Sequence, residues 1–527
     1  MGLVGRDHPS GRIAYADAGS VAASFQLQGL EQAPHIWTSD AKKGTVPRES
    51  VFAHVTMTSK YSSVGPARGT VPSRAQIVKT TTLALATGTC AGLLALAAPL
   101  RAQGADTLPG RLGMVTLHCR GNQDLSDIDW LSRAVSRGTE VYFVRKPGQG
   151  RALVSSFGPG PAWLGYPAMV GIKPGETVSD VDLRARARYA AASAVAVTTV
   201  LIVAGCAAVA PLSLAVLFAL AAALSFGGIP TLAQGLWQQT AELPFLAGAL
   251  AAALWTRQYP RLLSVVTFCA ALALWLRPAD APLLLAIATL GVVQSMRAAQ
   301  SLWTVSVALA TALFAILPVA IWNLWYFDTL FSVAQWSVNQ RITEHVFSIS
   351  PRRIALGLSG LVISPGRGIL WFAPLVPAVL GFSATKAIRR NSPGALILGT
   401  GIVGQWLLSG MFFKWWGGAG FGPRLMAETV WVAAAIAALV ASRLSYTGRI
   451  SLQIACVIGA VVGIGGLFHF DITAVELEFD RIHRPESYFA LRAGPWTSIF
   501  SGAPKPIIDA PPGPFRYCAP QSLVRAR

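Results

Sequence analysis

The sequence predicts an all-α polytopic membrane protein with about eleven transmembrane helices and a small mixed helix and strand region in its outer loops. Of its 527 residues, 53% are hydrophobic and only 13% are charged, and the mean hydropathy is +0.50. Soluble proteins carry about 25% charged residues. Apolar stretches close to the roughly 20 residues that span a bilayer recur along most of the chain. Composition and spacing together favour a membrane-embedded helical bundle.

Residues 1–78 form a polar extension ahead of the first long apolar stretch, which begins near Thr81. The extension has mixed charge and no long apolar run, so it lacks the pattern of a secretory signal. We expect it to be disordered and to lie in the cytoplasm. Met57 could instead be the true initiator, because nothing before it predicts a folded element.

Residues 79–470 carry the predicted transmembrane domain. Pro211 separates two helices that would otherwise merge, since proline breaks a helix interior. The weakest spans are the one that holds Glu242 and the one that opens at Asp280. The predicted spans cover residues 81–100, 189–209, 211–227, 240–256, 261–277, 279–296, 302–322, 367–385, 394–413, 425–442 and 450–470.

Loop charge predicts a multi-pass protein of the inner (plasma) membrane with its N-terminus in the cytoplasm. Lys and Arg prefer short cytoplasmic loops, and every second short loop here is basic and free of carboxylates. The long pieces 101–188, 323–366 and 471–527 then lie outside, so the C-terminal tail is extracytoplasmic. The basic inner loops contain Arg257, Arg261, Arg297, Lys386, Arg389, Arg390, Arg443 and Arg449. Three arginines depart from the cytoplasmic preference, because they lie in a long outer loop: Arg184, Arg186 and Arg188.

The net charge of +19 does not predict nucleic-acid binding, because the basic residues are dispersed and form no long run. We interpret the charge as membrane topology together with contact with anionic lipid. The six cysteines have no paired spacing, so neither a zinc site nor a disulfide framework is predicted. Cys119 and Cys518 are the two that the predicted topology leaves outside, where one disulfide could form.

Two glycine-rich loops, 362–374 and 412–424, each place an arginine between tryptophans at a predicted membrane edge. Glycine lets backbone approach a ligand, and arginine matches phosphate oxygens in a bidentate manner. We predict that Arg367 and Arg424, with Gly366 and Gly422, bind a lipid-linked phosphate. The alternative is that these residues only anchor helix ends at the headgroup level.

An acidic cluster in the first outer loop is the candidate for catalysis. Asp124, Asp127 and Asp129 fall within six residues, and carboxylates this close repel one another, so one of them is easier to protonate, as suits a general base. The cluster could instead hold a divalent cation through its oxygen atoms. A structural alternative is that Asp124 or Ser126 caps a short helix. No cofactor is otherwise predicted.

The rest of the outer loops predicts small structured pieces. The alternation in 140–145 and the following segment predicts a small hairpin. The Gly-Pro-rich stretch after it, up to residue 169, is too short and broken to span. Residues 354–364 predict a membrane-surface helix that leads into the turn at Arg367. Arg277 and Asp280 predict a local ion pair, and Glu344 and His345 predict a solvated turn.

The order of these pieces resembles the GT-C superfamily of polytopic glycosyltransferases, which includes the protein O-mannosyltransferases and the lipid-A aminoarabinose transferases. The resemblance is nearest to bacterial relatives described as dolichyl-phosphate-mannose-mannosyltransferase-like, and it covers roughly residues 80 to 500. The matching motifs are Asp124-Leu-Ser-Asp127, Val154-Ser-Ser-Phe-Gly-Pro-Gly160, Gly235-Leu-Trp-Gln-Gln239, Leu276-Arg-Pro-Ala-Asp280, Trp322-Asn-Leu-Trp-Tyr-Phe-Asp328, Ser364-Pro-Gly-Arg-Gly368, Trp415-Trp-Gly-Gly418 and Gly422-Pro-Arg424.

This resemblance implies an inverting transfer from a polyprenyl-phosphate sugar to an acceptor hydroxyl on a glycan, lipid or protein, with an acidic residue of the first outer loop as base. On this chain the base would be Asp124 or Asp127, and Arg367 and Arg424 would bind the carrier phosphate. Further pocket candidates are Trp237, Gln238, Lys414, Trp415 and Trp416. The alternatives are a lipid-linked sugar flippase, a non-catalytic subunit that binds the lipid carrier, and an envelope polymerase or ligase.

Overall fold

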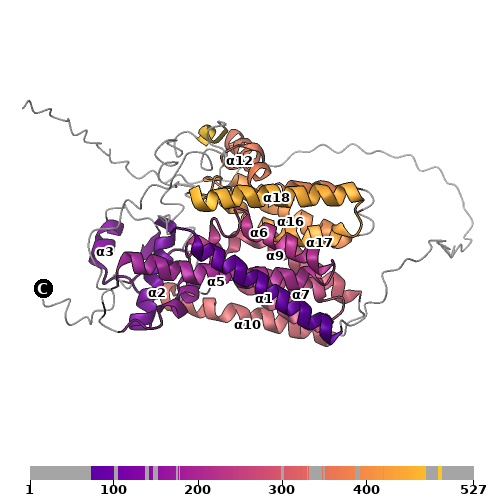
Figure 1. The fold of residues 1–527 in the computed structure, drawn as a ribbon. Helices are drawn as coiled ribbons and strands as arrows, with labels where there is room; N and C mark the ends of the chain where they lie inside the picture. Colours follow the sequence, from indigo (N-terminus) through magenta and orange to yellow (C-terminus); the bar gives the residue numbers. More distant parts are fainter. Residues whose placement is uncertain are drawn as a thin grey trace, which may run out of the picture. The chain divides into compact units, whose positions relative to one another are not determined.

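The computed structural model describes residues 73–99, 105–136, 142–145, 152–173, 176, 178–297, 302–328, 330, 347, 350–385, 388, 392–418, 420–469 and 485–489. Residues 1–72 therefore lie outside the described part, as do Lys386, Arg389, Arg390, Glu344, His345 and Cys518. Within this part the fold is a bundle of helices with a single two-stranded sheet (Figure 1). This confirms the predicted all-α class.

Eleven predicted spans each overlap a helix of the bundle. The corresponding helices are α1 (Arg74–Ala97), α5 (Asp180–Cys206), α6 (Leu212–Leu224), α7 (Gln238–Trp255), α8 (Leu263–Leu276), α9 (Ala281–Met296), α10 (Leu302–Phe327), α14 (Leu375–Ala384), α16 (Pro393–Met411), α17 (Thr429–Ala441) and α18 (Tyr446–His469). The shorter elements are the α-helices α2 (Leu108–Arg120), α3 (Asp129–Ser136), α4 (Gly160–Gly165), α12 (Pro351–Ile363) and α13 (Ile369–Phe372), and the 3-10 turns η1 (Ala105–Thr107), η2 (Tyr166–Met169), η3 (Leu232–Gln234), η4 (Pro260–Leu262), η5 (Pro278–Asp280), η6 (Arg424–Met426) and η7 (Pro485–Phe489).

Seven helical segments of the described part are long and apolar enough to cross a membrane. They contain α1, α5, α9, α10, α16, α17 and α18. The apolar segments around α6, α8 and α14 are shorter, and α7 has 18 residues and carries Glu242. Pro211 precedes α6 directly and keeps it separate from α5, as its sequence position predicts.

The helix ends agree with local sequence signals. Ser73 and Gln76 form a capping box that starts α1 inside the stretch assigned to the N-terminal extension, so that helix begins earlier than its apolar residues indicate. Ser179 accepts a hydrogen bond from the Asp182 amide and starts α5 in the same way. On α10, outward side chains such as Trp303 and Trp325 are largely exposed, which suits a lipid-facing surface.

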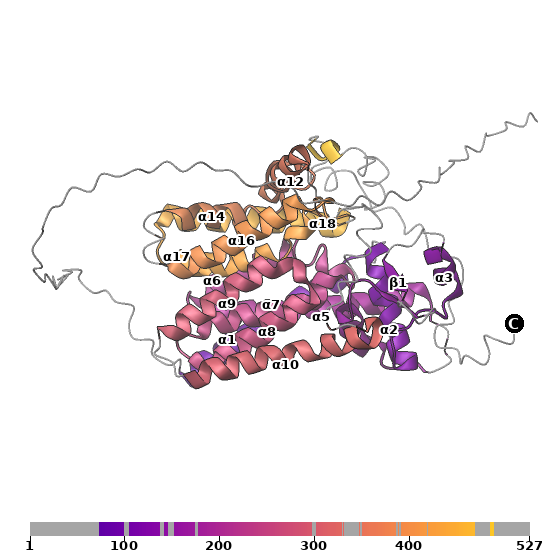
Figure 2. The ribbon, with the colours of Figure 1, turned by 180° about the vertical axis from the view of Figure 1, so that it is seen from behind.

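The elements of the first outer loop gather at one end of the bundle, where α2, α3 and the β-strands lie beside the helix ends in both views (Figures 1 and 2). The predicted hairpin is present as β1 (Phe143–Arg145) and β2 (Leu153–Ser155), which pair antiparallel with Val144 opposite Val154. α4 and η2 follow and pack against α2 and α5. The Tyr326 hydroxyl at the end of α10 accepts a hydrogen bond from the Gln123 amide at 2.8 Å and attaches the loop to the bundle.

The three arginines that depart from the charge rule are all engaged within the protein. Arg184 pairs with Asp180 at 2.5 Å, and Asp180 also pairs with Arg111 at 2.8 Å. Arg186 donates to the Ala168 carbonyl at 2.6 Å, and Arg188 donates to the Ala95 carbonyl at the end of α1. These contacts attach the segment 101–188 to α1 and α5.

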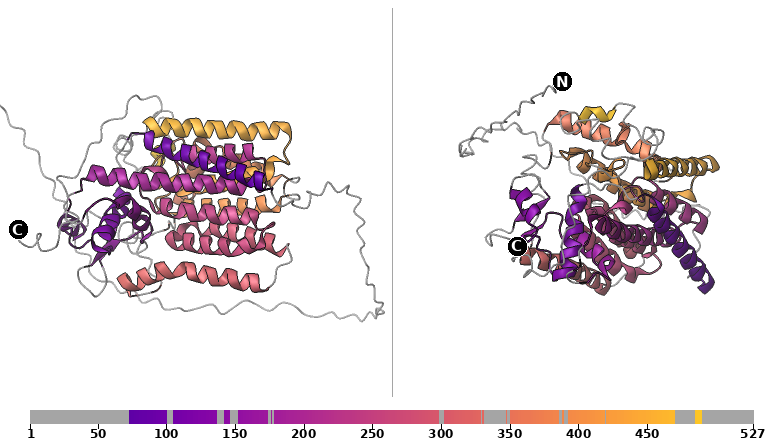
Figure 3. Two further views of the ribbon diagram at one scale, coloured as in Figure 1. Left: turned by 60° about the horizontal axis from the view of Figure 1, so that its bottom comes forward. Right: turned by 60° about the vertical axis from the view of Figure 1, so that its left-hand side comes forward.

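α10 and α18 lie on opposite sides of the bundle (Figure 3). α17 is covered by its neighbours. Nearly every residue of α17 is buried, and most of them are alanine or valine. Small side chains let membrane helices approach closely. α17 follows directly after the second arginine loop, so this buried helix fixes that loop against the bundle end that carries α2 and the hairpin.

Candidate functional site

The candidate site is built around an ion pair between two segments that are far apart in sequence. Asp106 lies in η1, shortly after α1, and Arg424 begins η6, just before α17. An Asp106 carboxylate oxygen lies 2.5 Å from Nη1 of Arg424, and both side chains are close to nine-tenths buried. Sequence analysis did not single out Asp106, because it has no carboxylate neighbours.

The electrostatics of Asp106 make it a candidate proton acceptor. Burial raises the pKa of its carboxyl above the usual value, and the charges of Arg424 and Lys414 oppose that shift. Burial in turn lowers the pKa of Lys414, and Asp106 opposes that shift. Asp106 is thus a partly desolvated carboxylate that faces two cations.

Trp237 completes the surroundings of Arg424. The Arg424 guanidinium lies over the Trp237 ring, 4.2 Å from its centroid, which is a cation–π arrangement. The indole nitrogen of Trp237 donates to the Thr231 carbonyl at 3.0 Å, so the ring orientation is fixed. Nε of Arg424 has no hydrogen-bond partner among the described residues. Nη1 has no hydrogen-bond partner either, apart from its ion pair with Asp106. A planar cation that keeps donors in this way can bind an anionic ligand.

Arg367 has a different environment from Arg424. It is 2% exposed, and its guanidinium donates to the Gly422 carbonyl at 2.7 Å, to the Gly418 carbonyl at 2.9 Å and to the Gly420 carbonyl. The Tyr488 ring lies 5.2 Å from the guanidinium carbon. Arg367 thus holds the backbone of the second arginine loop, and phosphate binding by Arg367 stays a prediction.

The glycines of the second loop are required by its backbone. Gly417, Gly418 and Gly422 all have positive φ, which side chains disfavour. At Gly422, with φ +77°, an added Cβ would also lie 2.8 Å from Phe226. Gly366 in the first loop donates its amide to the Tyr488 carbonyl at 3.0 Å. The glycine-rich composition of the two loops therefore has a structural cause.

The remaining pocket candidates surround this centre. Trp415 and Trp416 are buried, pack edge to face and contact the Tyr488 ring. The Gln238 amide donates to the Leu276 carbonyl at 2.7 Å and to the Phe157 carbonyl at 3.3 Å. These side chains connect the ends of several helices, and their contact with a substrate stays a prediction.

The predicted catalytic aspartates make contacts within the first outer loop. Asp124 accepts hydrogen bonds from the Ser126 amide at 2.9 Å and the Leu153 amide at 3.0 Å, which joins its turn to β2. Asp127 pairs with Arg120 at 3.1 Å, and Asp129 begins α3. The predicted short helix is therefore present, but it begins at Asp129, and Asp124 organises a turn before it.

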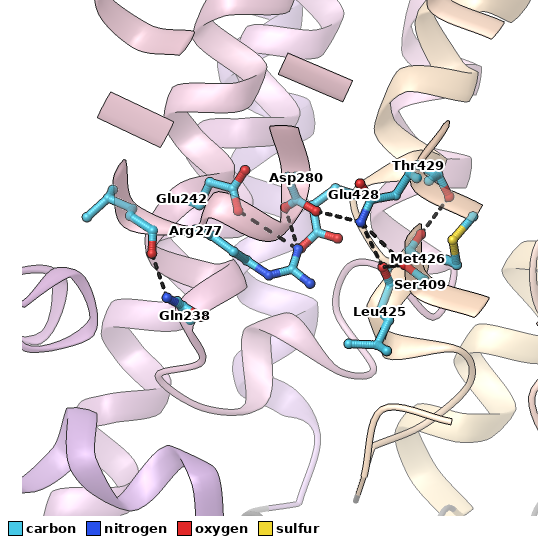
Figure 4. Close-up of polar contacts among 12 residues, drawn as sticks. Gln238, Glu242, Arg277, Asp280, Ser409, Leu425, Met426, Glu428 and Thr429 are labelled. Atoms are coloured by element: carbon cyan, nitrogen blue, oxygen red, sulfur yellow. Dashed lines mark hydrogen bonds and ion pairs between the residues drawn. The ribbon is translucent and has the colours of Figure 1, made fainter. Parts of the chain in front are cut away.

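A second polar centre lies at the ends of α7, α8, α9 and α17 (Figure 4). Glu242, Asp280 and Glu428 are fully buried, and their carboxylate oxygens lie within 4.8 Å of one another. Arg277 contacts Asp280, which confirms the predicted local pair, and its Nη1 also lies 2.6 Å from Glu428. Arg277 therefore supplies a cation to all three acids.

The adjacent His118 and Cys119 form a His-Cys pair near the end of α2. A ring nitrogen of His118 lies 3.0 Å from the Ile172 carbonyl, and the ring packs against Tyr166. Cys119 is disulfide-bonded, whereas Cys90, Cys206, Cys269 and Cys456 are free. Both residues of the His-Cys pair are thus engaged in structural contacts.

No protein-family model matches the sequence, and no curated protein matches it. Among solved structures, the chain is similar to the archaeal oligosaccharyltransferase AglB from Archaeoglobus fulgidus in complex with an inhibitory peptide and a dolichol-phosphate, with 14% identity over 80% of this chain and 56% of that chain and a TM-score of 0.40. The apo form of the Archaeoglobus fulgidus oligosaccharyltransferase matches with 14% identity over 82% of this chain and 61% of that one, with a TM-score of 0.38.

A third similar structure is that of ArnT from Cupriavidus metallidurans bound to undecaprenyl phosphate, with 13% identity over 81% of this chain and 76% of that chain and a TM-score of 0.41. The chain spans about 60% of the length of the two oligosaccharyltransferase structures.

Proposed function

We propose that this protein is a membrane glycosyltransferase that moves a sugar from a polyprenyl-phosphate donor to an acceptor hydroxyl. The observation that carries the proposal is the buried pair of Asp106 and Arg424, with Lys414 nearby and Trp237 beneath the guanidinium. A carboxylate beside cations combines a proton acceptor with a phosphate binder. The glycine-rich loop that Arg367 holds lets a phosphate approach the backbone.

In the proposed reaction, Asp106 takes the proton of the acceptor hydroxyl. The acceptor oxygen then attacks the anomeric carbon of the donor sugar, and the bond between that carbon and the phosphate oxygen breaks. The bonding electrons leave with the polyprenyl phosphate, whose added negative charge Arg424 and Lys414 stabilise. Attack opposite the leaving phosphate inverts the anomeric configuration.

Donor binding would itself strengthen the base. Arg424 now faces Asp106 at 2.5 Å and opposes the effect of burial on the pKa of that carboxyl. A donor phosphate that draws the guanidinium toward itself weakens this opposition, so the pKa of Asp106 rises and the carboxylate accepts a proton more readily. Asp106 would therefore be most basic when the donor is in place.

Two observations support a site on the outer face of the membrane. Cys119, in the loop at the site end of the bundle, is disulfide-bonded, and disulfides form in oxidising compartments. The exposed basic residues of the opposite helix ends favour the cytoplasm. These residues are Arg257, Arg261, Arg297, Arg443 and Arg449.

The test is transfer by the purified full chain in liposomes, with a panel of radiolabelled polyprenyl-phosphate sugars. Asp106→Asn should lower the rate by about 10²- to 10⁴-fold, the usual contribution of a general base. Glu176→Gln, which changes an exposed carboxylate of the same loop, is the matched control and should leave the rate unchanged. Full activity of Asp106→Asn would overturn the proposed base.

The competing functions give different results in the same assay. A carrier-binding subunit would bind the lipid without transfer, and binding would depend on Arg424 and be unchanged by Asp106→Asn. A flippase would move labelled lipid between leaflets without forming a product. Glu242 and Gln405, the polar residues within spans that a transporter could use, belong to the cluster around Arg277.

A further inference from the structure

The buried cluster of Glu242, Asp280, Glu428 and Arg277 has more acids than bases. Glu242, Asp280 and Glu428 are each 0% exposed, and Arg277 is 3% exposed. Uncompensated charge is costly away from water. With every group ionised, the three carboxylates exceed the one guanidinium by two negative charges, so some other positive charge must balance the cluster.

The geometry shows that Arg277 already occupies the central position. Its Nη1 contacts Asp280, lies 2.6 Å from Glu428 and lies 4.0 Å from Glu242. A metal ion shared by the three carboxylates would compete with this nitrogen for the same oxygens. The group that carries the missing positive charge must therefore be small enough to fit between the carboxylate oxygens and the Arg277 guanidinium.

Three buried side chains here, Glu242, Gln405 and Glu428, have oxygens without a hydrogen-bond partner among the described residues, although Oε1 of Glu428 lies 2.6 Å from Nη1 of Arg277. Neither carboxyl oxygen of Glu242 has a hydrogen-bond partner among the described residues, and neither has Oε1 of Gln405. Gln405 is 1% exposed, and its amide nitrogen points into the cluster and donates to Asp280 at 2.9 Å. Unsatisfied buried oxygens of this kind indicate a missing hydrogen.

Asp280 is the natural partner for Glu242. Carboxyl oxygens of the two groups lie within 4.8 Å of each other, and two carboxyl groups can form a hydrogen bond only if one of them carries a proton. Asp280 already accepts from both Arg277 and Gln405. Glu242 has the weaker contact with Arg277, so the proton belongs on Glu242.

We propose that this cluster is a buried proton-binding site, in which Glu242 is protonated and its hydroxyl group donates a hydrogen bond to Asp280. Two helix N-termini complete the balance, because Asp280 directly precedes α9 and Glu428 directly precedes α17. Each helix N-terminus contributes about half a positive charge. One proton then brings the cluster close to neutrality.

The proton also affects the candidate site, because the cluster holds the segment that follows Arg424. Gln405 and Ser409 both donate toward the Leu425 carbonyl, at 3.4 Å and 3.3 Å, and Glu428 binds Arg277. The charged or titratable groups that face Glu242 are Asp280, Arg277 and Glu428. Loss of the proton adds a negative charge beside the residues that hold the segment after Arg424.

The sign of the pH effect follows from proton linkage. The folded protein holds a proton that exposed Glu242 in the unfolded chain has lost at neutral pH, so folding is favoured less as the pH rises. One such proton changes the folding equilibrium constant by about tenfold per pH unit over the range in which the unfolded chain has lost it and the folded protein still holds it. Glu242→Gln is the neutral mimic and removes this dependence.

The experiment uses the full chain in nanodiscs and needs no activity, so it does not depend on the proposed transfer reaction. Infrared spectra at pH 7 should contain the C=O stretch of a protonated carboxylic acid that Glu242→Gln lacks. The unfolding temperature of the wild type should fall with rising pH more steeply than that of Glu242→Gln. Glu176→Gln, with an exposed carboxylate, should behave as the wild type.

Three outcomes would overturn the proposal. The first is the absence of a protonated carboxyl band from the wild type, which tests the proton even if Glu242→Gln fails to fold. The second is a band that persists in Glu242→Gln, since the proton then lies on another acid. The third is stabilisation of the wild type, but not of Glu242→Gln, by Mg²⁺ or Mn²⁺, which would assign the balancing charge to a metal ion.

Discussion

The loops around Arg367 and Arg424 have similar composition but use their arginines differently. Arg367 donates to three carbonyl oxygens of the neighbouring loop. Arg424 faces the carboxylate of Asp106 and the ring of Trp237. An arginine bound to fixed carbonyls is part of the fold, whereas one paired with a carboxylate can exchange it for another anion. The partner of each arginine, rather than its sequence motif, therefore decides whether its guanidinium is available to an anionic ligand.

The largest expected difference comes from changing each arginine to glutamine. Arg424→Gln should lower transfer by about 10²- to 10³-fold, as expected for a lost group that stabilises a developing anion. It should also destabilise the protein, but less than Arg367→Gln does, because the buried Asp106 carboxyl can take up a proton once its partner is lost. Arg367→Gln should destabilise the protein by about 3 kcal/mol or more, because it leaves buried carbonyls without charged donors. Transfer rates and unfolding curves measured on both variants check this. Equal loss of stability in both variants would break the comparison.

The second effect concerns the loop that Arg367 holds. Gly422→Ala should cost about 1–3 kcal/mol of stability, because the residue has φ +77° and a Cβ there would meet Phe226. Gly381→Ala is the matched control, since no atom lies within 4 Å of a Cβ at that position and its φ is not positive. The thermal unfolding midpoints of the two variants are compared, and only that of Gly422→Ala should fall. An unchanged midpoint for Gly422→Ala would mean that the loop can rearrange.

A smaller effect concerns pH. Lys414 lowers the pKa of the Asp106 carboxyl, so Lys414→Gln should raise that pKa. A base with a higher pKa becomes protonated at higher pH, so the acid limb of the pH–rate profile should move toward alkaline pH. Lys414→Arg keeps the charge and should leave the limb in place. A shift in the acidic direction would contradict the role of Asp106 as base.

The smallest effect is expected at Asp124. Asp124→Asn keeps an oxygen that can accept from the Ser126 and Leu153 amides, so stability should change by less than about 0.5 kcal/mol and transfer should be retained. Asp124→Ala loses both bonds and should cost about 1–2 kcal/mol. Transfer and unfolding measurements on both variants test this. Abolished transfer in a stable Asp124→Asn would restore the sequence-based assignment of the base.

The helices could be predicted from the sequence because bilayer thickness demands long apolar runs, and each predicted span overlaps a helix. Pro211 and the Arg277–Asp280 pair were also predictable, since both are local effects. The exact helix lengths were not. α6 ends in a turn before its apolar stretch ends, and α14 begins only after Pro374, because α13 occupies the first part of its stretch.

The candidate site was predictable only in part. Arg424 and Trp237 stand out by residue type, and the structure brings them together. Asp106 does not stand out, because its importance comes from burial beside an arginine more than 300 residues away. The signal available in sequence was position alone, an acidic residue soon after the first span. Asp124, by contrast, sits in a crowded acidic motif whose geometry serves a turn.

The burial of α17 has a consequence for biogenesis. This helix is the tenth of the eleven apolar helices that the structure describes, and nearly all of it is covered by other helices. Membrane proteins are synthesised from the N-terminus, so the earlier helices must leave a space that α17 enters late. Arg424 and Glu428 precede α17 directly and arrive with it. Both polar centres are therefore completed only when residues 424–428 have been synthesised, and a chain truncated before residue 424 would contain most of the bundle without either centre complete.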